Sequence, residues 1–204
     1  RNYHTKCTRL HFFSGDYLHT IDFCTYYPPE NNRLQRQYLG YIVARPLETS
    51  KIGRSVLRFP SAADSFCLCK SYFPVNIVGH ELKVLGLPFL QQEAKVSVCA
   101  TASLWMVTRA LSARYHRQAY TTVDIARGAT RYDASTGRTF PSQGLDIPQV
   151  SAALREMRYE PQIFWPVEYE PSPPQEEGIS ERHINAKRLL YYYVESEIPV
   201  LASI

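Results

Sequence analysis

The chain has 204 residues and a net charge of +4, and its hydrophobic and charged fractions of 45% and 21% are those of an ordinary globular protein. It contains no apolar run of the ~18 residues that a membrane-spanning helix needs, and residues 1–13 lack the apolar core of a secretory signal. Five cysteines, a sparse and odd number, favour a reducing compartment, so we expect a soluble cytoplasmic protein.

Residues 1–85 have the composition of a β-rich domain. Aromatic and β-branched residues fill several short segments separated by turn-forming residues, which predicts strands over 10–13, 17–27, 37–45, 52–58, 66–72 and 80–84. The tripeptide Gly86-Leu87-Pro88 is expected to join this domain to a second one over residues 86–204. Up to Leu85 there are eleven Lys and Arg residues against six Asp and Glu. They form no cluster, so nucleic-acid binding is not expected.

Helices are predicted to dominate after residue 86. The helix signals are a long uncharged run after Ser97, possible caps at Thr122 and Asp146 with Pro148 in the first turn, and Ser180 before a last helix. They give helices over 99–115, 123–127, 147–157 and 181–194. Short apolar runs predict strands over 161–165 and 199–204. The chain is therefore expected to be an α+β protein, with a β-rich N-terminal domain followed by helices and a C-terminal antiparallel sheet.

The uncharged run from Ser97 to Thr108 predicts a helix that is buried inside the protein. With Ser97 as N-cap, Cys99 lies in the first turn, where unpaired N–H groups and the helix dipole favour a thiolate. The side-chain amide of Gln92, in the loop before the helix, can donate to an oxyanion together with the Cys99 backbone N–H, and Gln91 is the alternative. The opposing interpretation is a buried and inert cysteine.

This segment, with its Gln-Gln pair, short polar run, Ser-Val-Cys-Ala and apolar helix containing Trp105 and Met106, resembles the nucleophile segment of papain-like cysteine peptidases. It is most similar to the bacterial branch that includes the bacteriocin leader-processing peptidases. The resemblance implies a papain-like domain over residues 86–204, with Cys99 as nucleophile and Gln92 or Gln91 in the oxyanion hole. Ala100 stands where that family usually has glycine. Residues 38–57 are also similar to the N-terminal region of uncharacterised bacterial proteins of this type.

A general base for Cys99 is not identified in the sequence. His116 lies at the far end of the predicted helix, ~25 Å away at ~1.5 Å per residue. His80 and His183 remain candidates, although neither matches the family's position. The resemblance implies that the strand over 199–204 precedes a strand carrying the histidine. Either that histidine lies beyond Ile204, or the catalytic dyad is incomplete.

The sequence therefore predicts a papain-like cysteine hydrolase, a peptidase that acts on a protein or peptide through an acyl-enzyme intermediate. One alternative is an acyl transferase of the transglutaminase or deamidase type. Another is a non-catalytic interaction module whose N-terminal domain binds a partner protein. No cofactor or metal is expected, because the spacing of Cys67 and Cys69 is too tight for a zinc knuckle and no glycine-rich phosphate loop occurs.

Overall fold

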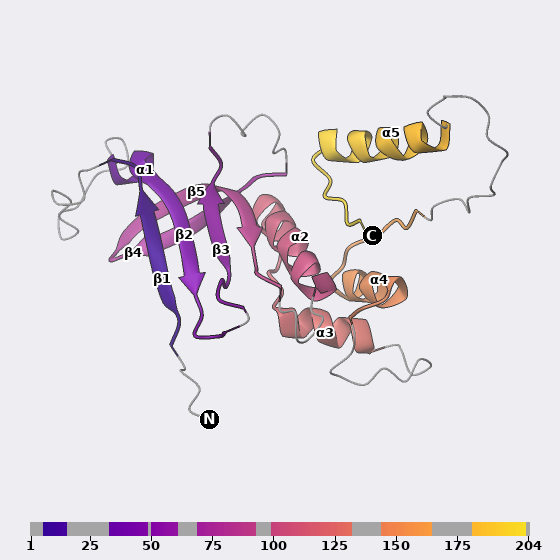
Figure 1. The fold of residues 1–204 in the computed structure, drawn as a ribbon, viewed down its shortest axis with the longest axis horizontal. Helices are drawn as coiled ribbons and strands as arrows, with labels where there is room; N and C mark the ends of the chain where they lie inside the picture. Colours follow the sequence, from indigo (N-terminus) through magenta and orange to yellow (C-terminus); the bar gives the residue numbers. More distant parts are fainter. Residues whose placement is uncertain are drawn as a thin grey trace.

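The computed structural model describes residues 6–15, 33–48, 50–60, 69–92, 99–131, 144–164 and 181–202, with side chains in the last range described from Lys187 onwards. The described residues form a five-stranded, curled antiparallel sheet with helices packed against one side of it (Figure 1). The strands are β1 (Thr8–Phe13), β2 (Tyr38–Ala44), β3 (Ser55–Arg58), β4 (Ser71–Ile77) and β5 (His80–Phe89). The predicted α+β class is confirmed at this level.

Strand β5 links the two halves of the sheet, whose order is β1-β2-β3-β5-β4. Its first seven residues pair with β4 and its last four pair with β3, and Gly86 pairs with both Ser71 and Arg58. The prediction that Gly86-Leu87-Pro88 forms an interdomain joint is therefore wrong, because these residues continue β5 to Phe89. The predicted boundary between residues 85 and 86 falls inside this strand.

Buried and exposed residues alternate along β4 and β5, and the buried ones form the inner face of the sheet. Every second residue of each strand is buried, among them Phe73, Val75, Leu82 and Val84. These side chains form one core cluster, which is closed by Leu34 from helix α1 (Arg33–Gln37), by Tyr38 and Val56 from the sheet, and by Ala113. The opposite face carries partly exposed apolar residues, including Leu10, Phe12 and Leu57.

Most of the predicted strands are present with shifted ends, and among the described residues the strand predicted over 66–72 overlaps the observed one only at Ser71 and Tyr72. The observed strand β4 begins at Ser71 and runs to Ile77, whereas residues 61–68 lie outside the described part. Pro74 interrupts the strand pattern in the sequence, yet β4 is at the sheet edge, where a proline costs no internal ladder hydrogen bond. The strand predicted over 17–27 also lies outside the described residues.

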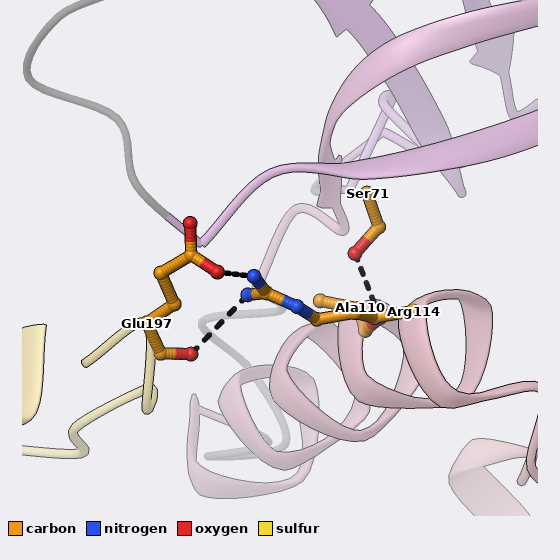
Figure 2. Close-up of polar contacts among 4 residues, drawn as sticks. All are labelled: Ser71, Ala110, Arg114 and Glu197. Atoms are coloured by element: carbon orange, nitrogen blue, oxygen red, sulfur yellow. Dashed lines mark hydrogen bonds and ion pairs between the residues drawn. The ribbon is translucent and has the colours of Figure 1, made fainter.

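Helix α2 (Cys99–Tyr115) has the predicted bounds and lies between the sheet and helices α3 (Thr122–Thr130) and α4 (Ile147–Glu156) (Figure 1). Its first half packs into a second core cluster through Ala102, Leu104 and Trp105, with Ile125, Ala129, Ala153 and Met157 from the neighbouring segments. Its second half contacts the sheet. There the hydroxyl of Ser71 donates to the carbonyl of Ala110 at 2.9 Å (Figure 2).

Capping boxes define the starts of α3 and α4. Asp146 caps α4 with Gln149 as its reciprocal partner and with proline in the first turn, as predicted. In α3 the cap is Thr121 and its partner is Asp124, so the predicted cap at Thr122 is one residue too late. Both boxes satisfy backbone N–H groups that would otherwise be unpaired at the helix starts.

The last helix, α5 (Glu181–Glu195), is present as predicted, but the C-terminal antiparallel sheet is absent from the described residues. Residues 161–164 and 199–202 are not strands, and Val200 and Leu201 are 43% and 40% exposed. These short apolar runs have no strand beside them in the described part of the chain, so no ladder forms.

Glu197, just after α5, contacts helix α2. The guanidinium of Arg114 forms an ion pair with the Glu197 carboxylate and donates a hydrogen bond to the Glu197 main-chain carbonyl (Figure 2). None of the described helices is long and apolar enough to cross a membrane.

Candidate functional site

Cys99 is the first residue of α2, which agrees with its predicted place in the helix. Its side chain is an exposed free thiol, so the cysteine is not buried as the opposing interpretation expected. The backbone N–H groups of the first helical turn have no partners within the helix and favour negative charge nearby. The predicted cap, Ser97, lies outside the described residues.

Gln91 and Gln92 differ in their surroundings. The Gln91 side-chain oxygen accepts a hydrogen bond from the Ile52 N–H at 2.7 Å, and the Gln91 carbonyl accepts one from the Ser50 hydroxyl at 3.2 Å. Gln91, just after β5, is therefore hydrogen-bonded to the loop between β2 and β3. Gln92 is exposed. The Gln91 contact uses the side-chain oxygen and not the amide N–H groups, so both Gln91 and Gln92 remain candidate donors to a bound substrate.

A cavity of about 700 Å³ lies beside these glutamines, between the sheet and α2. Gln91 and Gln92 line it together with Ala102 and Trp105 of α2. Cys99 is not part of the lining, but it precedes Ala102 by one turn, ~4.5 Å along the helix axis. The structure therefore brings both glutamines to a cavity that begins one turn away from Cys99.

Four arginines also line this cavity, namely Arg9, Arg45, Arg54 and Arg109. Three of the guanidinium groups lie over aromatic rings, with ring-centre distances of 4.9 Å for Arg9 on Tyr41, 5.5 Å for Arg54 on Trp105 and 5.6 Å for Arg109 on Phe73. Arg45 donates to the Ser50 hydroxyl, to the Ile52 carbonyl at 3.0 Å and to the Gln91 carbonyl at 3.4 Å.

The sequence did not identify these arginines as a group. The relevant signal was the basic excess before residue 85, which contains Arg9, Arg45 and Arg54. They are far apart in the sequence, so only the folding of the sheet brings them together. Arg109 joins them because it lies on the cavity side of α2, two turns after Ala102.

The histidines with described side chains are His11, His80 and His116, and none of them lines the cavity. His80 begins β5, ~30 Å from the end of that strand at ~3.3 Å per residue. His116 follows the far end of α2. His11 contacts the Tyr38 hydroxyl at 2.9 Å, and burial, with a smaller effect from Arg9, lowers the pKa of its ring. The prediction that His116 is not the base is retained. His80 lies at the opposite end of β5 from Gln91 and Gln92, so its position does not favour it as the base.

No group of three His, Cys, Asp or Glu side chains that could hold a metal ion occurs within the described ranges. Cys69 is half-buried, and burial raises the pKa of its thiol. Cys67 lies outside those ranges.

No protein-family model, curated protein or solved structure significantly matches the chain.

Proposed function

We propose that the chain is a papain-like cysteine hydrolase, a peptidase that uses Cys99 as its nucleophile. The observation that carries the proposal is the exposed thiol at the first residue of α2, a helix whose next turn borders a cavity shared with Gln92. The cavity one turn away from this thiol offers space for a substrate.

In the proposed reaction the Cys99 thiolate attacks the carbonyl carbon of a peptide bond. The resulting oxyanion accepts hydrogen bonds from the Cys99 backbone N–H and the Gln92 side-chain amide. The amine leaves with a proton from a general acid, and water then hydrolyses the thioester and frees the thiol. The proton carrier is a histidine, and His183, whose side chain lies outside the described part, is the candidate that remains within the sequence.

Peptide hydrolysis by single-cysteine variants tests this proposal. A mixture of unrelated peptides is incubated with the protein, and new termini are identified by mass spectrometry. We expect Cys99→Ala to abolish cleavage and Cys69→Ala, at a half-buried thiol outside the cavity, to retain it. Gln92→Ala should reduce kcat by roughly 100- to 1,000-fold, as loss of one oxyanion donor does. Cleavage that persists in Cys99→Ala overturns the proposal.

Adding a primary amine to the same reaction distinguishes hydrolysis from acyl transfer. A hydrolase releases a free carboxylate, whereas a transferase of the transglutaminase type gives an amide with the added amine. Both reactions share the Cys99 acyl-enzyme, so the product mass is the deciding measurement.

A non-catalytic binding module is the second candidate. It is favoured by one observation, that none of the three histidines with described side chains lines the cavity. Alkylation by iodoacetamide at about pH 6 separates the two, because an activated thiol reacts there as a thiolate and an ordinary one does not. Cys7, an exposed thiol in the lining of the cavity, is the internal reference. Equal rates at Cys99 and Cys7, with no peptide cleavage, would establish the binding module.

A further inference from the structure

Among the described residues, four arginines from four parts of the fold line the cavity beside α2. Arg9 comes from β1, Arg45 follows β2, Arg54 precedes β3 and Arg109 lies on α2. Each is permanently charged. Within the described residues none of the four forms an ion pair, and the lining contains no carboxylate. The cavity therefore has a concentrated positive charge that the described part of the protein does not neutralise.

The contacts of these arginines leave hydrogen-bond donors unused. The guanidinium carbons of Arg9, Arg54 and Arg109 lie over aromatic rings, and none of these three side chains donates a hydrogen bond to another described residue. The Nε of Arg45 is buried and has no acceptor among the described residues, although its Nη2 has three. A buried donor without a partner is costly, and an anion in the cavity is a natural acceptor.

Like charges that converge on one concave site repel each other, and walls of low dielectric constant strengthen this repulsion. An anion relieves it, and an anion with several charges relieves it more. The volume of about 700 Å³ lies within the range of ~300–1,000 Å³ typical of small-molecule sites. We propose that this cavity binds a small polyanion carrying two or more phosphate or carboxylate groups, held by Arg9, Arg45, Arg54 and Arg109.

This inference does not rest on the proposed function. None of the four arginines is assigned a role in cleavage, and Cys99 does not line the cavity. Anion binding is therefore expected to be the same in the Cys99→Ala variant as in the parent chain. Failure of one proposal leaves the other intact.

Isothermal titration calorimetry of the chain with pyrophosphate and with citrate tests the site. We expect one-to-one binding at low ionic strength that weakens as salt is added, because salt screens the attraction. Binding of pyrophosphate alone assigns the site to phosphates, binding of citrate alone assigns it to carboxylates, and comparable binding of both assigns it to polyanions of either kind.

Single arginine substitutions locate the binding. Arg54→Gln and Arg109→Gln should each weaken the binding by roughly 10- to 100-fold, the loss typical of one charged hydrogen-bond donor. Arg155→Gln, at an exposed position on α4 outside the cavity, should leave it unchanged. Arg54 is itself exposed, so its variant is expected to fold even if Arg109→Gln does not.

Three results would overturn the proposal. The first is that neither pyrophosphate nor citrate binds. The second is that the folded Arg54→Gln and Arg9→Gln variants bind them as tightly as the parent chain does. The third is that only an extended poly-glutamate peptide binds, which would make the site a surface for acidic peptides.

Discussion

Replacement of Gly86 by alanine should destabilise the sheet at the point where β5 exchanges one partner strand for the other. A Cβ at this position would lie 2.3 Å from the main-chain oxygen of Leu57, whereas real contacts of this kind are essentially never shorter than 3.0 Å. The two strands must therefore separate by about 0.7 Å, which lengthens hydrogen bonds of ~2.9 Å beyond the limit of useful geometry. Loss of about two such bonds costs roughly 2 kcal/mol.

Urea unfolding followed by circular dichroism measures this loss, and thermal unfolding should show a decrease in Tm of about 4–8 °C for a chain of this size. Gly128→Ala is the matched control. Its new methyl group would lie 3.3 Å from the Glu156 Cβ and inside helix α3, where alanine is intrinsically better than glycine, so a change under about 1 kcal/mol is expected. A Gly86→Ala protein as stable as the parent would refute the register assigned to β3 and β5.

Two further predictions concern the helical part of the molecule. Leu104→Ala, at a fully buried position, should lower the free energy of unfolding by about 3–5 kcal/mol. Leu57→Ala is the control, and because Leu57 is 41% exposed it should lower the free energy of unfolding far less. Equal effects of the two substitutions in urea unfolding would contradict the assigned core. The pKa of Asp124 is lowered by hydrogen bonds from the Thr121 backbone and hydroxyl, so its contribution to stability is present above the ordinary value of 3.8 and is lost as pH falls through the lowered pKa. Asp124→Asn should therefore be less stable than the parent at pH 6, and the difference should shrink as pH falls and the Asp124 carboxyl becomes protonated. A difference of unchanged size at low pH would argue against this cap.

The helices could be predicted because their signals are local. The uncharged run after Cys99 and the pair of Asp146 and Pro148 determine where α2 and α4 begin, whatever the rest of the chain does. Strand predictions depend on partners that the sequence does not show. Residues 199–202 have the apolar composition of a strand but lack a neighbouring strand among the described residues, whereas β4 contains Pro74 and is nevertheless paired along its length.

The place of Cys99 at the start of α2 was predictable for the same local reason, since the helix signal lies within a single segment. The arginine cavity was not predictable. Arg9, Arg45 and Arg54 reach it only because β1, β2 and β3 are neighbours in the sheet, and Arg109 reaches it only because α2 packs across that face. The charge excess was visible in the sequence, but its convergence is a property of the tertiary structure.

The double pairing of β5 determines how this chain can be divided into fragments for expression. A cut between residues 85 and 86 would leave β4 with most of its partner but would remove Gly86 to Phe89, the segment that pairs with β3. The N-terminal fragment would then expose a new strand edge, which is a site for aggregation. A cut after Phe89 keeps the sheet whole but removes α2 and leaves part of the sheet's inner face uncovered. Fragments intended for solution work should therefore retain the sheet and α2 together.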